Sequence, residues 1–247
     1  MAATWGQPGY DVRLEWGGEG VGALGGVCAV LVVVDVLSFC TTTDLVLARG
    51  SRVLPVKWGG ERGIAVARGA GAIIAGEGEW TLRPSSVTEI PAGKLLALPS
   101  PNGATLCEAA ATTDALVLAG CLRNASAVAA RALELAEGRP IGVIPAGERW
   151  GVDLLSEAVE FGPLRPCVED QLGAGAIIAA LAAAGRSLSP EAALAAAAFG
   201  ATDITDALTR CASGQELIAA GHANDVVLAA QPDVSTEAPV LTERILS

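Results

Sequence analysis

Three acidic residues, Asp35, Glu77 and Glu148, each follow a short run of apolar residues in the sequence. Asp35 comes directly after such a run, and each glutamate comes after a run and a glycine. A carboxylate in that position is costly to bury unless it is paired or bound to a metal ion. Together the three could supply two or three oxygen ligands to Mg²⁺, with water completing the octahedral shell. The alternatives are structural: Asp35 could cap the next helix or form a salt bridge, and the glutamates could be solvated loop residues.

Two polar segments precede predicted helices and could bind an anion. They are Ser100-Pro101-Asn102-Gly103 and Arg123-Asn124. Free backbone N–H groups at a helix N-terminus form a ready anion site, although turn and capping chemistry would explain the same residues. A third polar pair, Glu169-Asp170, opens the longest helix predicted in the C-terminal third. Acids are favoured there by the helix dipole alone.

The usage of histidine and cysteine argues against zinc. The sequence holds one histidine, His222, and six cysteines without a CxxC pair. A zinc site needs a cluster of such residues, and the spacing also indicates no disulfide framework. Any metal should therefore be a hard cation on oxygen ligands, with Mg²⁺ as the first choice. The GxGxxG match at residues 20–25 precedes a predicted strand, which is the wrong context for a dinucleotide site.

Composition and charge exclude several classes of protein. The chain has 247 residues, of which 51% are hydrophobic and 17% charged, so it can bury a core and is not disordered. The net charge of −11 argues against a nucleic-acid groove. The N-terminus lacks the pattern of a signal peptide, and no apolar stretch is long enough to cross a bilayer. We expect a cytoplasmic protein without nucleic-acid or membrane partners.

The elements that must position these residues alternate along the chain. The pattern predicts strands at 27–34, 52–56, 72–75, 94–98, 115–119, 141–144 and 225–229. It predicts helices at 41–49, 61–68, 104–111, 124–137, 169–184, 190–199, 203–211 and 215–220. Such alternation indicates an α/β fold, with a mostly parallel sheet covered by helices on both faces. Ligands of these sheets sit at the carboxyl ends of the strands, where the acids and polar segments fall. No composition break divides the chain, so we expect a single domain over 1–247.

The order of these motifs resembles a known family. The segments are VVVDVL at 32–37 with threonines after it, Gly76-Glu77, SPNG at 100–103, LRNA at 122–125, AGE at 146–148 and EDQLGAG at 169–175, with Gly221 and Asp225-Val226 later. Over residues 26–230 the chain resembles the 2-phosphosulfolactate phosphatase, or ComB-like, family. The resemblance implies a three-layer α/β/α sandwich with a mostly parallel central sheet. It also implies a Mg²⁺-dependent phosphatase acting on a small anionic phospho-acid on the route to coenzyme M.

The resemblance also suggests roles for the residues. Asp35, Glu77 and Glu148 would bind metal or activate water, with Glu169 and Asp170 as second candidates. Asp35 could alternatively be a nucleophile that forms an aspartyl phosphate. The substrate contacts would come from Ser100, Asn102, Gly103, Arg123 and Asn124. The substrate is a small anionic molecule, and homodimerisation stays open.

Two departures from the family pattern concern the substrate. Ser38 stands where the family usually has an arginine, and residues 80–86 (WTLRPSS) lack the usual glycine and asparagine. Arg83, Ser85 and Ser86 could form a replacement anion site. Two alternatives follow: a magnesium phosphatase for another phospho-hydroxy acid, or a non-catalytic metabolite-binding protein on the same scaffold.

Overall fold

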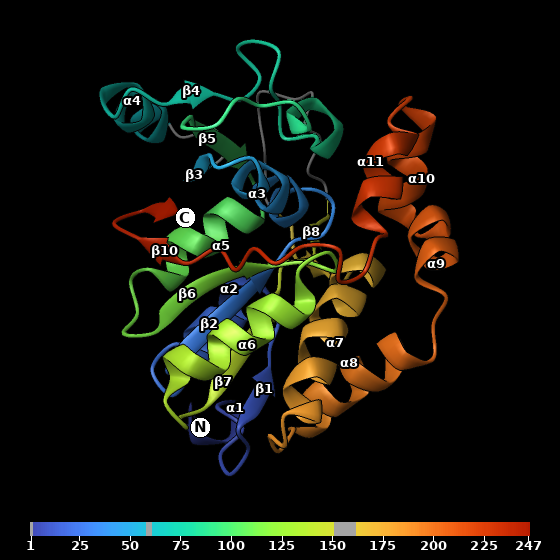
Figure 1. The fold of residues 1–247 in the computed structure, drawn as a ribbon. Coiled ribbons are helices and arrows are strands. Elements are labelled where there is room, and N and C mark those ends of the chain that lie inside the picture. Colours follow the sequence, from blue (N-terminus) through green and yellow to red (C-terminus); the bar gives the residue numbers. More distant parts are fainter. Residues whose placement is uncertain (1, 58–60, 151–161) are drawn as a thin grey trace.

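A four-stranded, all-parallel sheet forms the centre of the molecule, in the order β1 (Val12–Leu14), β7 (Ile141–Pro145), β2 (Val30–Val34) and β6 (Leu116–Gly120). We analysed a computed structural model that describes residues 2–57, 61–150 and 162–247. Strand β2 is buried along its whole length, as its continuous run of valine and leucine predicts for a central parallel strand. Helices surround this sheet, so the expected α/β fold with a mostly parallel central sheet is confirmed (Figure 1).

The register of the central sheet brings three strand ends to one edge. Val34 lies opposite Gly120 of β6 on one side and Pro145 of β7 on the other. The residues that follow these strands, which include Asp35 and Glu148, therefore start from the same level of the sheet. A two-stranded hairpin of β8 (Glu148–Arg149) and β9 (Leu164–Arg165) continues from this edge.

A second, five-stranded sheet lies beside the first in Figure 1. Its order is β10 (Leu241–Thr242), β11 (Ile245–Leu246), β3 (Arg52–Lys57), β5 (Leu95–Ser100) and β4 (Ile73–Ile74). Strands β3, β5 and β4 are parallel, whereas β10 and β11 are antiparallel. The alternation along the sequence did not show this division, because the strands of both sheets have the same apolar, β-branched character.

Small residues let the longest helix pack closely on the central sheet. Helix α7 (Val168–Ala183) contacts α8 (Pro190–Gly200) extensively, and both lie along one side of the sheet (Figure 1). A Cβ atom on Gly173 would lie only 2.6 Å from the side chain of Val36 and 3.0 Å from that of Val34 in β2. This close approach fixes the N-terminus of α7, and with it Glu169 and Asp170, near the end of β2.

The remaining helices pack against the two sheets or against other helices. They are α1 (Ala2–Trp5), α2 (Gly17–Leu24), α3 (Phe39–Ala48), α4 (Glu61–Gly69), α5 (Gly103–Ala110), α6 (Ala125–Ala136), α9 (Ile204–Arg210), α10 (Ala212–Ala219), α11 (Ala223–Ala229) and the 3₁₀ turn η1 (Pro84–Val87). Among the described helices, none is both long enough and apolar enough to span a membrane.

The predicted strand at 225–229 is wrong, because this segment is helix α11. Val226 and Ala229 are buried while Val227 is exposed, which is the spacing of a helix packed on one side. The short apolar run alone did not distinguish the two structures. Strand β1 and helix α2 were also missed. The Gly-rich stretch at 20–25 belongs to α2 and the residue after it, so it forms no phosphate loop.

Candidate active site

Asp35 joins the two sheets at their carboxyl edges. Its Oδ2 accepts hydrogen bonds from the backbone N–H of Gly103 at 2.7 Å and from the Ser100 hydroxyl at 3.4 Å. Its Oδ1 accepts one from the backbone N–H of Phe39 at 3.3 Å. Because Phe39 and Gly103 begin α3 and α5, the carboxylate caps two helices at once. Asp35 therefore does cap helices, as the structural alternative predicted. It also lies near other acids.

Asp170 fixes the loops on either side of Asp35. Its Oδ1 accepts a hydrogen bond from the backbone N–H of Val36 at 2.8 Å, and its Oδ2 accepts one from Gly147 at 2.8 Å. These bonds tie the N-terminus of α7 to the loops that follow β2 and β7. Both carboxylate oxygens are thus engaged, and the geometry gives Asp170 a positioning role.

Four carboxylates, of Asp35, Glu148, Glu169 and Asp170, influence one another in this region. Burial, together with the nearby Glu148 and Glu169, raises the pKa of Asp35 to about 7. Burial also raises the pKa of Glu148, with Glu169 adding to the effect and a hydrogen bond from Asn102 opposing it. The pKa of Asp170 lies well above its usual range because of burial, Asp35 and Glu169. Arg165 is a nearby cation that lowers the pKa of Glu148, but burial and the neighbouring acid outweigh it.

The atoms that this acidic cluster offers as metal ligands are of the type that a hard divalent cation prefers. All are carboxylate oxygens, and a cation would relieve their mutual repulsion. In the described part of the chain, however, no three acidic, cysteine or histidine side chains are close enough together to hold a metal ion. Mg²⁺ commonly takes one or two carboxylates and keeps several waters. Asp35 and Glu148 are therefore the pair that we would assign to it.

Glu77 does not join the acidic cluster. Its carboxylate lies 2.6 Å from the guanidinium of Arg68, and its side chain is 54% exposed. Glu77 follows β4, which is an outer strand of the second sheet. The predicted metal trio of Asp35, Glu77 and Glu148 is thus not assembled, because the strand before Glu77 belongs to a different sheet from the other two.

Arg123 is committed to an internal network, contrary to its predicted contact with substrate. Its Nε donates to Oδ2 of Asp44 at 2.8 Å, and its Nη1 donates to the carbonyl of Leu228 and to Gln231. The side chains of Arg123 and Asp44 are 9% and 0% exposed. Residues far along the chain supply these partners, so the sequence around Arg123 did not reveal them.

Asn124 and Gly103 also form hydrogen bonds with other residues of the protein. The side-chain oxygen of Asn124 accepts a hydrogen bond from the backbone N–H of Cys121 at 2.9 Å. The amide nitrogen of Asn124 is buried and has no partner among the described residues. The backbone N–H of Gly103 is taken by Asp35, so it is not free for an anion. In the possible replacement site, the backbone N–H of Ser85 donates to the Asp225 carboxylate and the Ser86 hydroxyl donates to the backbone carbonyl of Arg83.

A cavity of about 300 Å³ opens beside the acidic cluster. Its lining includes Lys57 and Arg149 together with Asn102, Thr105 and Ala146. Asn102 also binds Glu148, so this carboxylate of the cluster lies next to the cavity. Lys57 reaches it because it lies opposite Ser100 in the register of β3 and β5.

The sequence interpretation assigned no substrate contact to either basic residue of this cavity. Lys57 directly follows the predicted strand at 52–56, and inspection of that strand end would have found it. Arg149 follows Glu148 but had been given no role. A small anionic molecule could therefore meet two basic side chains here, next to a cluster of acids.

Comparison with protein-family models places this fold and site among the phosphatases, which are phosphoric monoester hydrolases. The matching model is described as 2-phosphosulpholactate phosphatase and covers residues 23–244. The chain therefore belongs to the 2-phosphosulpholactate phosphatase family, as the order of its motifs indicated.

Proposed function

We propose that this protein is a Mg²⁺-dependent phosphatase that hydrolyses 2-phosphosulfolactate to sulfolactate and phosphate. The observation that carries the proposal is the placement of a buried acidic cluster against a cavity with two basic side chains. Membership of the family supports the phosphatase chemistry, and the cavity chemistry supports an anionic substrate. A cytoplasmic location and a homodimer stay predictions.

The acidic cluster cannot accept a phosphate dianion without added positive charge, because like charges at short range repel strongly at low dielectric. Asp35 and Glu148 would hold the cation. When bound, Mg²⁺ would act as a Lewis acid on the phosphoryl oxygens. This requirement is the physical reason for proposing metal dependence in a protein with a net charge of −11.

The residues of the chain divide the remaining tasks. Ser100, Gly103 and Phe39 hold the Asp35 carboxylate in one orientation through their hydrogen bonds. Glu148 lies beside the cavity and is oriented by Asn102, so its carboxylate can accept the proton of an attacking water molecule. Asp170 keeps the loops that carry Asp35 and Glu148 together.

The test is phosphate release from a panel containing 2-phosphosulfolactate, 2-phospholactate and p-nitrophenyl phosphate, with Mg²⁺ or with excess chelator. We expect Glu148→Gln to reduce kcat by about a hundredfold or more, the size of effect seen when a key electrostatic group is lost. Glu77→Gln is the matched control, because Glu77 is exposed and paired with Arg68. Equal losses in the two variants, or full wild-type turnover in chelator, would contradict the proposal.

A further inference from the structure

The two basic residues of the cavity have fewer described partners than Arg123. Arg149 has one described ion pair, with Glu19 at 3.5 Å, and Glu19 is largely exposed. A guanidinium carries five N–H donors, and among the described residues Arg149 uses one of them, in this ion pair. Lys57 forms no ion pair within residues 2–57, 61–150 and 162–247. Arg123, in contrast, is buried and donates three hydrogen bonds inside the protein.

The acidic and basic side chains at the cavity are separated from each other. The acids Asp35, Glu148 and Glu169 form the cluster beside the cavity. The basic residues Lys57 and Arg149 line the cavity itself. A substrate with two anionic groups can satisfy this arrangement in one orientation. Its phosphoryl group would lie toward the carboxylates that hold the cation, and its other anionic group would lie toward the basic side chains. In the reverse orientation the phosphoryl group would lie at the basic side chains, away from the carboxylates that would hold the cation.

We infer that Lys57 and Arg149 form a subsite for the second anionic group of the substrate, a carboxylate or a sulfonate, and so determine specificity for phosphorylated hydroxy acids. This inference rests on the proposed phosphatase function and adds the residues that select the substrate. The cavity volume of about 300 Å³ is at the low end of ligand pockets, which suits a small acid. The subsite also supplies positive charge in a chain that has Ser38 in place of an arginine.

The experiment compares kcat/KM for a phosphorylated hydroxy acid with kcat/KM for p-nitrophenyl phosphate, which has no second anionic group. The variants are Lys57→Met and Arg149→Met. We expect each to lower the ratio of the two kcat/KM values by about ten- to a hundredfold, as for loss of a hydrogen bond to a charged group. Using 2-phosphosulfolactate and 2-phospholactate in parallel distinguishes a sulfonate from a carboxylate as the preferred group.

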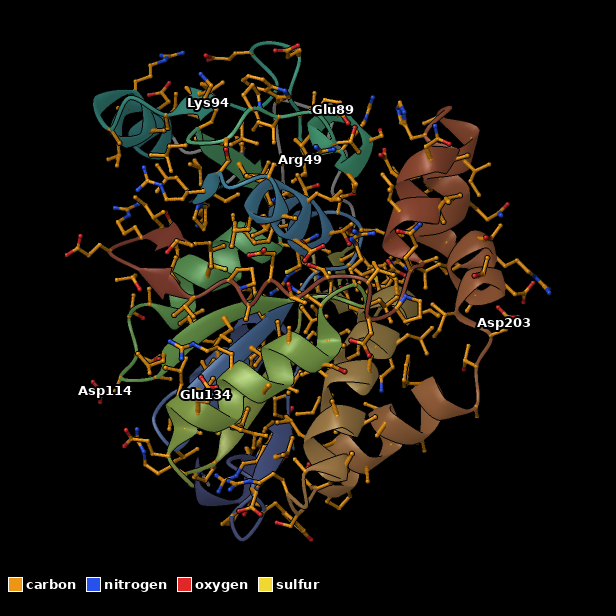
Figure 2. All side chains as sticks on the ribbon, in the orientation of Figure 1. Arg49, Glu89, Lys94, Asp114, Glu134 and Asp203 are labelled. Carbon is orange, nitrogen blue, oxygen red and sulfur yellow. The ribbon has the colours of Figure 1, made fainter. Side chains whose placement is uncertain are left out.

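Two matched controls remove the same side chains elsewhere. Lys94→Met changes the other lysine of the chain, and Figure 2 shows Lys94 near the end of the molecule that carries α4 and β4. Arg131→Met changes an exposed arginine of α6 that pairs with Glu134. Both controls should keep the wild-type ratio. A ratio that stays unchanged in Lys57→Met and Arg149→Met, or that falls equally in the controls, would overturn the subsite.

A failure of the proposed phosphatase function gives a different result. If the wild type releases phosphate from no ester, binding of sulfolactate is measured by calorimetry instead. Weaker binding in Lys57→Met and Arg149→Met than in the controls would support the anion subsite on a protein without this activity. Equal binding in all variants, or no binding to the wild type, would refute the subsite.

Discussion

Replacement of Arg123 by methionine should destabilise the protein without removing a substrate contact. The change keeps much of the aliphatic stem and deletes the guanidinium that donates to Asp44, Leu228 and Gln231. Asp44 would then be a carboxylate with 0% side-chain exposure and no cation. Its second oxygen, Oδ1, already lacks a hydrogen-bond partner in the described structure. The single variant therefore leaves a buried charge uncompensated.

The size of the effect follows from this burial. Removing one partner of a buried ion pair typically costs about 3–5 kcal/mol. For a chain of this length, 1 kcal/mol shifts Tm by roughly 2–4 °C, so Arg123→Met should lower Tm by roughly 6–20 °C. Burial also raises the pKa of Asp44 in spite of Arg123, so the ion pair does not fully repay desolvation. The double variant Asp44→Leu/Arg123→Met should therefore recover most of the lost stability.

The assay combines urea unfolding of the wild type, both single variants and the double variant with phosphatase kinetics below the unfolding transition. The double-mutant cycle should give a large coupling energy between Asp44 and Arg123. The KM for the anionic substrate should stay close to the wild-type value in folded Arg123→Met. Near-normal stability together with a KM raised tenfold or more would refute this reasoning and restore Arg123 as a substrate contact.

Four further predictions concern the acidic cluster. Asp35→Asn should lower kcat by at least about a hundredfold while circular dichroism shows a folded protein, and near-normal activity would make Asp35 purely structural. Gly103→Ala should reduce activity, because the new Cβ would lie 2.8 Å from Oδ2 of Asp35; Gly78→Ala, where a Cβ meets open space, is the control. Chelator should abolish turnover and Mg²⁺ or Mn²⁺, but not Zn²⁺, should restore it, so rescue by Zn²⁺ alone would contradict the oxygen-ligand assignment. Because the pKa of Asp35 is raised from 3.8 in the unfolded chain to about 7, the folded state binds more protons between these values. Stability contributed by Asp35 should therefore fall as pH rises from about 4 to 7, and metal-free Tm should be higher at pH 6 than at pH 8, less so in Asp35→Asn.

The sequence predicted that Asp35 and Glu148 lie at the same edge of a sheet, and this prediction has a physical reason. Both follow apolar runs that form neighbouring parallel strands, and the residues after such strands meet at one sheet edge. Glu77 follows an equally apolar run, but β4 pairs with β5 in the second sheet. Local patterning shows that a segment is a strand, whereas the division into two sheets depends on pairing between distant segments. The same argument that located Asp35 therefore misplaced Glu77.

The partners of the polar side chains were harder to predict than the elements. Arg123 has an appropriate position for an anion contact, and only the packing of α3 against its strand end brings Asp44 to it. Lys57 was predictable in principle, since it follows a predicted strand directly. Its relevance depends on the pairing of β3 with β5, which places it beside Ser100. The local sequence thus predicts where a residue lies along a strand. It does not predict which hydrogen-bond partner each polar group has.

The bridge made by Asp170 has a consequence for the order in which the protein folds. The central sheet pairs Val12 with Ile141 and Val34 with Pro145, so it closes only after long loops have been brought together. Asp170 binds Val36 and Gly147 later still in chain order, when α7 has been synthesised and packed. Such non-local closure slows folding. On the ribosome, a nascent chain that ends before α7 holds Asp35 and Glu148 but lacks Glu169 and Asp170, so the loops after β2 and β7 are without the bridge that Asp170 makes between them.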